Sequence, residues 1–308
     1  TQGNYNNHIG VPLTLLAIAK DIEIAIVEMG ANHAGEIEEL CNISLPNYGI
    51  ITNIGKAHLE GFGTIETIID TKTALYRHLL KQDGLAFVNK KDPLLVKLSQ
   101  DNNRIFYRSE DGIDGRVTHS NIPFCSFIPV QNKIDLSEVR SQMIGEYNLD
   151  NMLAAMAIAL YFKVDIKKII NALEKYSPSN NRSQYLETAK NKLILDAYNA
   201  NPSSTLLALN NFNKIEEGNQ MIILGDMLEL GDSAQEEHQK IVDELAKVHY
   251  EVILVGPLYS SCSLTSKMKA FADSSDCKSF LSDYQPKNKI ILIKGSRGLK
   301  LETLQDVL

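Results

Sequence analysis

Two residues able to bind a divalent cation follow predicted strands in the first half of the chain. Glu28 closes the predicted buried strand at residues 22–28, and His58 comes shortly after another predicted strand at residues 49–53. Ligands of parallel sheets bind beyond the carboxyl ends of strands. A carboxylate is a hard ligand for such a cation, and an imidazole is an auxiliary one. On the residues alone, the pair is either a divalent-metal site or a capped turn beside a surface histidine.

Polar side chains also follow the predicted strands of the second half. Asp196 lies near the end of one predicted strand, with Asn199 and Asn201 just beyond it. Lys294 ends a later strand of the same half. Because the carboxyl ends of parallel strands share one edge of a sheet, these residues are candidates for a common binding site.

Three further features have both a functional and a structural interpretation. The Gly-Ser-Arg-Gly loop with Ser296 and Arg297 is either an anion-binding loop or a glycine turn with a solvated arginine. Asn148 and Asn151 open a predicted helix, where one is expected to cap the first turn and the other to contact a ligand. Lys72 lies within a predicted helix, where a lone lysine usually faces solvent.

Several motif-based functions are excluded. The sequence contains neither a G-x-x-x-x-G-K-[ST] motif nor a strand-framed G-x-G-x-x-G motif for binding phosphates. The H-x-E triplet at residues 58–60 is not followed by the P-C-x-x-C of zinc deaminases. The four cysteines are far apart and form no C-x-x-C pair, which indicates reduced thiols in a cytoplasmic protein.

Composition narrows the protein class. The 308 residues are 44% hydrophobic and 22% charged, which is typical of a globular chain and excludes wholesale disorder. A net charge of −7 argues against binding to nucleic acid or to anionic lipid. No apolar run approaches the roughly 20 residues that a membrane span requires.

The elements expected to position these residues form an α/β fold. In the second half, strands alternate with helices, which predicts right-handed crossovers and a mainly parallel sheet. One helix is predicted to begin at Asn201 with a proline behind it, and another at a capping box of Ser233 and Glu236. The expected strands are residues 192–198, 220–224, 251–255, 279–281 and 289–294.

The first half is also α/β but less regular. We expect helices at residues 12–20, 64–80 and 149–162, a strand at residues 85–89, and short β segments between residues 104 and 145. The polar stretch at residues 177–183 is the best linker in the chain. Two domains are therefore predicted, spanning residues 1–178 and 179–308.

Taken together, these segments resemble the Mur ligase family, and within it the branch that adds D-alanyl-D-alanine to UDP-N-acetylmuramoyl-tripeptide. The Asp-Ala-Tyr-Asn-Ala-Asn-Pro and Gly-Asp-Met-Leu-Glu-Leu-Gly stretches are the motifs specific to that branch. The resemblance spans residues 1–16, 27–37, 52–60, 145–155, 196–202, 224–231 (with His238) and 294–298.

The resemblance implies a central ATPase domain with a mainly parallel sheet, followed by a Rossmann-like carboxy-terminal domain. The chain starts with Thr1 and aligns just after the family's P-loop. We therefore expect a truncated chain that lacks its P-loop segment and is inactive alone. The implied reaction is amide-bond formation with ATP cleaved to ADP and phosphate, through an acyl phosphate, in peptidoglycan synthesis.

The resemblance also implies roles for individual residues. The implied ligands are ATP, Mg²⁺, UDP-N-acetylmuramoyl-tripeptide and D-alanyl-D-alanine. In this reading Glu28 and His58 hold magnesium with a carbamylated Lys72. The nucleotide contacts are Asn148, Asn151, Arg182 and Asp196, and the substrate contacts are Asn6, Asn7, Asn199, Asn201, Lys294, Ser296 and Arg297.

Two other functions remain open at this point. One is a different amide ligase of the same superfamily, acting on folate polyglutamate or on another stem-peptide residue, although the Asp-Ala-Tyr-Asn-Ala-Asn-Pro stretch argues against it. The other is a non-catalytic fragment that acts as a binding module, which the missing P-loop allows.

Overall fold

The computed structural model describes residues 1–55, 59–119, 123–179, 181–215, 219–228 and 230–308. The chain divides into two compact units. Unit 1 comprises Thr1–Arg116, Ile128–Glu138 and Leu149–Ile170, and unit 2 comprises Val117–Phe127, Val139–Asn148 and Asn171–Leu308. Among the described residues, no helix combines the length and the apolar character needed to cross a membrane.

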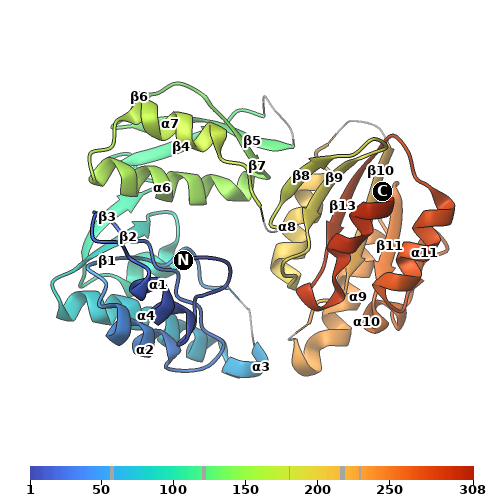
Figure 1. Cartoon of the computed structure of the whole chain (residues 1–308), viewed down its shortest axis with the longest axis horizontal. Helices are drawn as coiled ribbons and strands as arrows, with labels where there is room; N and C mark the ends of the chain where they lie inside the picture. Colours follow the sequence, from blue (N-terminus) through green and yellow to red (C-terminus); the bar gives the residue numbers. More distant parts are fainter. Residues whose placement is uncertain (56–58, 120–122, 180, 216–218, 229) are drawn as a thin grey trace. The chain divides into compact units, whose positions relative to one another are not determined.

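Unit 2 contains a six-stranded sheet. Figure 1 shows most of its strands side by side. Five consecutive strands are parallel to one another, and the sixth, at one edge of the sheet, is antiparallel to its neighbour. This confirms the predicted parallel sheet of the second half. In spatial order the strands are β12 (Met268–Phe271), β11 (Glu251–Val255), β10 (Asn219–Gly225), β13 (Lys289–Lys294), β9 (Lys192–Asp196) and β8 (Gln184–Glu187).

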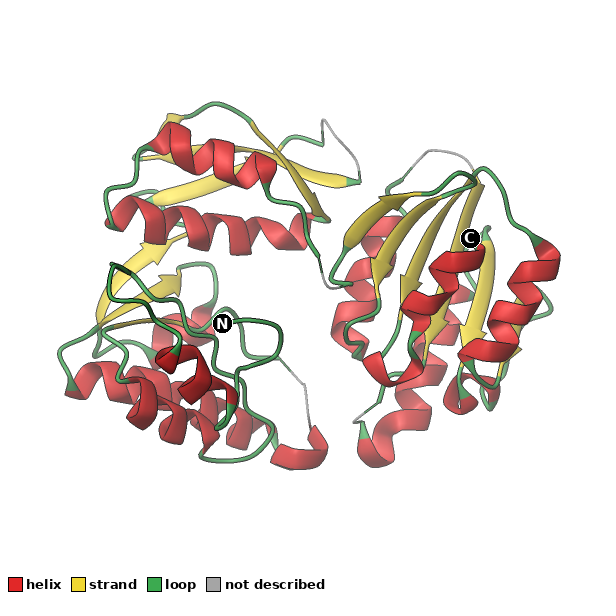
Figure 2. Ribbon diagram, viewed as in Figure 1, coloured by secondary structure: helices red, strands yellow, loops and turns green. Residues whose placement is uncertain are grey.

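Helices cover both faces of this sheet (Figure 2). One apolar cluster joins Ile222 and Leu292 of the sheet to Leu209 and Ile241 of two helices. A second cluster lies on the opposite face of the sheet. There the strand residues whose side chains point the other way pack against the helix at residues 274–284 and the 3₁₀ turn at residues 301–307. Because both faces are buried, the central strands are apolar throughout. The helices of this part are α8 (Pro202–Phe212), α9 (Ala234–Leu245), α10 (Pro257–Ser260) and α11 (Ser274–Tyr284), with 3₁₀ turns η2 (Gly231–Ser233), η3 (Arg297–Leu299) and η4 (Leu301–Val307).

Two local predictions in the second half are wrong. Residues 279–281 belong to helix α11, which begins after Asp273 because the Asp273 carboxylate accepts hydrogen bonds from the amides of Ser275 and Asp276. The Ser233 side chain makes no capping bond to α9, since its hydroxyl donates to the Leu230 carbonyl instead. By contrast, the predicted cap at Asn201 is confirmed.

The other sheet runs in the order β1-β2-β3-β4-β5-β6, and β7 pairs with β5. Strands β1 to β4 are parallel to one another, whereas β5 is antiparallel to β6 and β7. The core of unit 1 packs helices α2 (Glu36–Ser44) and α4 (Ile65–Lys81) against β1 and β2, through residues such as Leu40, Leu79 and Val88. The strands are β1 (Tyr48–Ile50), β2 (Leu85–Asn89), β3 (Asn103–Tyr107), β4 (Ile113–Val117), β5 (Phe124–Gln131), β6 (Ile134–Asp135) and β7 (Val139–Ile144).

The helices of the first half begin and end close to their predicted limits, with one exception. The predicted helix at residues 12–20 is instead the shorter α1, which begins earlier and ends earlier. Helix α4 and strand β2 confirm the predictions at residues 64–80 and 85–89. The helices are α1 (Gly10–Leu16), α2 (Glu36–Ser44), α3 (Leu59–Phe62), α4 (Ile65–Lys81), α5 (Pro93–Leu98), η1 (Glu146–Asn148), α6 (Leu149–Tyr161) and α7 (Ile166–Lys175).

The predicted buried strand at residues 22–28 is wrong. This segment has no strand pairing, and Ile22, Ile24 and Ile26 are 52%, 49% and 80% exposed. Its β-branched residues favour an extended backbone, but a strand also requires a neighbour to accept its hydrogen bonds. Here the Glu28 amide donates to the Thr1 hydroxyl instead of to a strand.

Candidate functional site

Asp196 and Lys294 meet at the carboxyl edge of the six-stranded sheet, as the sequence predicted. They end the adjacent parallel strands β9 and β13, where they are paired in register. The Lys294 ammonium donates to the Asp196 carboxylate at 2.7 Å and to the Asn199 carbonyl at 3.2 Å. The Lys294 side chain is only 3% exposed and that of Asp196 17%. This buried ion pair fixes the geometry of the strand ends.

Asp196 has a second set of contacts, with Ser183 and through it with Tyr147, that was not predicted from the sequence. The Asp196 carboxylate accepts a hydrogen bond from the Ser183 amide at 3.0 Å, and the Ser183 hydroxyl lies 2.8 Å from that of Tyr147. Burial raises the pKa of Tyr147 to about 12, so the phenol stays protonated at neutral pH. No local pattern predicts this contact because residues 147, 183 and 196 are distant in sequence.

Two arginines lie beside one tyrosine near this ion pair. The Arg182 guanidinium carbon is 3.9 Å from the centre of the Tyr198 ring, and that of Arg297 is 5.6 Å from it. Both arginines are exposed, and within the described residues neither forms an ion pair with a carboxylate. Two guanidinium groups that lie beside one aromatic ring and form no ion pair with a described carboxylate are suited to bind an anion. Tyr198 was not among the residues predicted to belong to a site.

The two asparagines beyond β9 have defined structural roles. The Asn201 side chain accepts a hydrogen bond from the Ser204 amide at 2.9 Å and caps helix α8, while the Ser204 hydroxyl completes the capping box. The Asn199 side-chain oxygen accepts from the neighbouring Ala200 amide at 2.8 Å. The side-chain N–H groups of both residues remain donors that a ligand could use.

Ser296 connects the loop after β13 to the loop after β10. Its hydroxyl accepts a hydrogen bond from the Leu228 amide at 2.9 Å, and its own amide donates to the Asp226 carbonyl at 3.2 Å. Ser296 is 4% exposed. The side chain predicted to contact substrate is thus buried within the protein, whereas its neighbour Arg297 is exposed.

In unit 1, Glu28 and the predicted substrate residue Asn6 are in contact. The side-chain amide of Asn6 donates to the Glu28 carboxylate at 3.0 Å, and the backbone amide of Gly30 donates to the backbone carbonyl of Asn6 at 2.8 Å. The Asn7 side-chain oxygen accepts from the amides of Ile9 and Gly10, in the turn that precedes helix α1. Glu28 itself is exposed and keeps carboxylate oxygen available for a hard cation.

Lys72 is half-buried on helix α4 and does not lie on a fully solvated face. Its ammonium donates to the Asn53 carbonyl at 3.2 Å, just beyond β1. Burial lowers the pKa of this lysine, which raises the fraction of neutral amine. A neutral amine is the form that reacts with carbon dioxide.

The remaining predicted residues lie at the start of α6 or outside the described residues. Asn148 is buried in the turn before α6, where its side chain donates to the Ile144 carbonyl at 2.8 Å, and Asn151 is exposed on the first turn of the helix. His58 falls outside the described residues. Across the part of the chain that the structure describes, no three His, Cys, Asp or Glu residues are grouped as metal ligands.

Comparison with known proteins identifies relatives of both halves. Residues 1–159 match the Mur ligase middle domain, and residues 181–297 match the Mur ligase, glutamate ligase domain. UDP-N-acetylmuramoyl-tripeptide–D-alanyl-D-alanine ligase of Haemophilus influenzae is 31% identical, with 98% of this chain and 68% of the relative covered. The ligase of that name from Escherichia coli is 30% identical, with 98% and 69% covered.

Solved structures give the same assignment. A crystal structure of MurF from Acinetobacter baumannii superimposes with a TM-score of 0.86 at 33% identity and covers 99% of this chain and 69% of that one. MurF ligase from Thermotoga maritima in complex with ADP has a TM-score of 0.87, with 100% and 72% covered. Its identity is 24%, so this second match supports the fold alone.

Proposed function

The chain belongs to the Mur ligase family, and from this we propose that it joins D-alanyl-D-alanine to UDP-N-acetylmuramoyl-tripeptide, with cleavage of ATP, in peptidoglycan synthesis. The observation that carries the proposal is that the relatives with this activity in their name match nearly the whole chain. The UDP-linked substrate places the reaction in the cytoplasm. We further propose a domain boundary between residues 178 and 179, near the start of the second family match.

The reaction needs negative charge to be balanced and two substrates to be aligned. The tripeptide carboxylate attacks the γ-phosphorus of ATP, which releases ADP and gives an acyl phosphate. The amino group of D-alanyl-D-alanine then attacks the acyl carbon, loses a proton and expels phosphate. Positioning and charge neutralisation supply most of the catalysis in such reactions. The exposed charges of Arg182 and Arg297 suit this requirement.

On the nucleotide side, we assign Asn148, Asn151, Arg182 and Asp196 to ATP. Arg182 is suited to a phosphate because its guanidinium is exposed and rests on the Tyr198 ring. Asp196 would repel phosphate, but its carboxylate is neutralised by Lys294 and can accept a hydrogen bond from a ribose hydroxyl. Asn148 and Asn151 are placed by the start of α6.

On the substrate side, we assign Asn6, Asn7, Asn199, Asn201, Lys294, Ser296 and Arg297. The contacts within the protein refine their roles. The Asn201 side-chain oxygen caps helix α8, and the Asn7 side-chain oxygen accepts from the amides of the turn before α1, so we assign the side-chain N–H groups of both residues to substrate. Since Ser296 is buried, it acts by fixing the loop, and Arg297 offers the charge for the dipeptide carboxylate.

For the metal, Glu28 provides the hard oxygen chemistry that Mg²⁺ requires, and we assign His58 and a carbamylated Lys72 beside it. When bound, Mg²⁺ neutralises phosphate charge. Carbamylation joins the neutral Lys72 amine to the carbon of carbon dioxide and releases one proton. It replaces an ammonium by an anion with two oxygens. The lowered pKa of Lys72, caused by burial, favours the amine needed for that step.

The proposed function is tested by phosphate release in the protein with its natural termini. We expect release that requires ATP, UDP-N-acetylmuramoyl-tripeptide and D-alanyl-D-alanine together. Arg297→Gln should raise the KM for the dipeptide. Lys300→Gln is the control, because it removes another positive charge from the same segment, and it should leave this KM unchanged. Turnover with a single amino acid in place of the dipeptide, and none with the dipeptide, would refute the assignment.

A further inference from the structure

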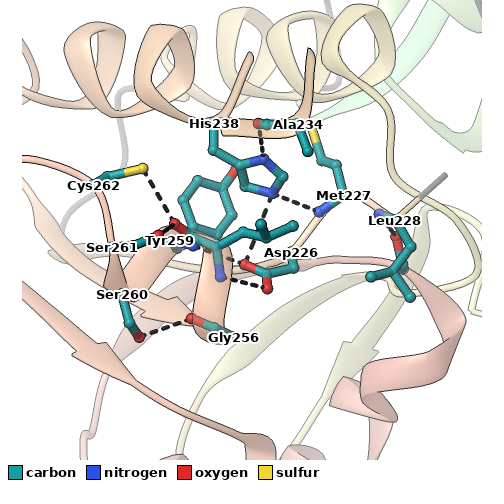
Figure 3. A network of polar contacts seen from close by, with 12 residues as sticks. Asp226, Met227, Leu228, Ala234, His238, Gly256, Tyr259, Ser260, Ser261 and Cys262 are labelled. Carbon is teal, nitrogen blue, oxygen red and sulfur yellow. Dashed lines mark hydrogen bonds and ion pairs between the residues drawn. The ribbon is translucent and has the colours of Figure 1, made fainter. Parts of the chain in front are cut away.

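Asp226 is a buried carboxylate to which the proposed reaction gives no role. It follows β10 directly and is 1% exposed. Its carboxylate accepts hydrogen bonds from the amides of Leu258 and Tyr259, each at 2.9 Å, and Figure 3 shows Asp226 beside Tyr259. Gly256 makes this approach possible, because a Cβ on Gly256 would lie 2.2 Å from the Asp226 carboxyl carbon, and its φ of 125° also favours glycine. The segment that begins α10 is therefore fastened to the end of β10.

His238 holds Met227, the residue that follows Asp226 in the loop after β10. It is fully buried on α9, where its Nε2 accepts a hydrogen bond from the Met227 amide at 2.9 Å and its Nδ1 lies 2.6 Å from the Ala234 carbonyl (Figure 3). Because a carbonyl only accepts, Nδ1 carries the proton, and the ring is neutral with Nε2 as the acceptor. Burial lowers the pKa of His238, in agreement with this neutral form.

The loop held in this way is joined to the loop that carries Arg297. The Asp226 carbonyl accepts from the Ser296 amide, and the Leu228 amide donates to the Ser296 hydroxyl. Glycines keep the two loops close, since a Cβ on Gly295 would lie 3.0 Å from the Cα of Gly225. Each of the three consecutive residues 226 to 228 is therefore hydrogen-bonded through its backbone. Asp226 and Leu228 bond to Ser296, and Met227 bonds to His238.

We propose that Asp226 and His238 are positioning residues, which hold the loop after β13 in place so that Arg297 meets the carboxylate of the incoming dipeptide. The inference rests on the proposed function for the identity of that carboxylate. The connection runs from α9 through the loop at 226–228 to Ser296 and its neighbour. Neither Asp226 nor His238 is exposed, so neither contacts the substrate.

The test compares three substitutions on α9 in the protein with its natural termini. His238→Leu removes the acceptor for the Met227 amide, whereas His238→Gln offers an amide oxygen in its place. Leu245→Ala is the matched control, because Leu245 is buried at the last position of the same helix, seven residues beyond His238. The readouts are hydrogen exchange at the amides of Leu228 and Ser296, the KM values for D-alanyl-D-alanine and ATP, and the Tm.

We expect His238→Leu to speed exchange at both amides and to raise the KM for D-alanyl-D-alanine about tenfold, in line with one buried N–H left without an acceptor. The KM for ATP should not change, and His238→Gln should recover most of both effects. Leu245→Ala should lower Tm without changing the KM for the dipeptide. An equal rise in that KM in Leu245→Ala, or unchanged exchange and KM in His238→Leu, would overturn the inference.

Failure of the proposed function gives a different result. If the unmodified protein does not use D-alanyl-D-alanine, the function is wrong, yet hydrogen exchange still reports whether His238 holds the loop at Leu228 and Ser296. If the dipeptide is used but exchange at Ser296 is insensitive to His238→Leu, the positioning link alone is wrong.

Discussion

The buried pair of Asp196 and Lys294 allows a quantitative prediction about unfolding. Among the described residues, the Lys294 ammonium, 3% exposed, donates to Asp196 and to the Asn199 carbonyl, so Asp196→Ala leaves it the Asn199 carbonyl alone. Breaking a buried ion pair by removing one partner costs about 3–5 kcal/mol, and we expect this variant to lose about 4 kcal/mol. Lys294→Met leaves a carboxylate that is 17% exposed and still bonded to the Ser183 amide, so we expect a smaller loss of about 3 kcal/mol.

The double variant separates the ion pair from general packing. With both charges removed, no unpaired charge remains buried, so Asp196→Ala with Lys294→Met should lose less stability than Asp196→Ala alone. The control is the pair of Lys278 and Asp306, which has the same 2.7 Å separation but side chains 34% and 62% exposed. Lys278→Met should cost less than about 1 kcal/mol because solvent screens this pair.

The assay is urea unfolding followed by circular dichroism, with hydrogen exchange of the β9 and β13 amides to assign the transition to this sheet. Losses in Asp196→Ala and Lys294→Met that are equal to the loss in Lys278→Met would refute the argument from burial. Additive losses in the double variant would refute the direct coupling of the two charges.

Three further outcomes follow from the site. Lys72→Ala should lose most ligase activity and recover part of it with a short-chain carboxylic acid, whereas Lys72→Arg should not recover; near-normal turnover of Lys72→Ala would exclude carbamylation. Asn201→Ala should lower the free energy of unfolding by about 1 kcal/mol through loss of the α8 cap, and Asn199→Ala by less; equal losses in urea titration would contradict the capping role. Burial lowers the pKa of His238 in the folded protein, so below pH about 6.5 this residue binds a proton more readily in the unfolded protein than in the folded one. The free energy of unfolding should therefore decrease as the pH falls below that value. His238→Gln should weaken that dependence, and an unchanged slope of unfolding free energy against pH would argue against a neutral buried ring.

Local sequence signals predicted the elements whose partners are near in sequence. Asn201 followed by proline defines its own helix start, and the apolar runs at β10 and β13 identify strands buried on both faces. The placement of Asp196 and Lys294 at the same edge followed from the rule that parallel strands end at one edge, whereas their ion pair was not predicted. These inferences needed no knowledge of distant contacts.

Predictions failed where the outcome depends on distant partners or on competing hydrogen bonds. Residues 22–28 have the β-branched composition of a strand, but pairing depends on a neighbour that the segment itself does not specify. Ser233 has the spacing of a capping box, yet its hydroxyl bonds the Leu230 carbonyl instead. The contact of Tyr147 with Ser183 likewise joins residues far apart in sequence, and Tyr198 gains its importance only from the two arginines beside it.

The strand order of the six-stranded sheet has a consequence for synthesis on the ribosome. Strand β13 lies between β10 and β9, although it is the last of the six to be translated. Before residues 289–294 leave the exit tunnel, the nascent chain can form only a β8–β9 hairpin and a separate β10–β11–β12 layer, each with an apolar edge open. Unpaired strand edges of this kind can form backbone hydrogen bonds with other chains and so lead to aggregation. A chaperone that shields β9 and β10 would therefore be most useful during the last stage of translation of this sheet.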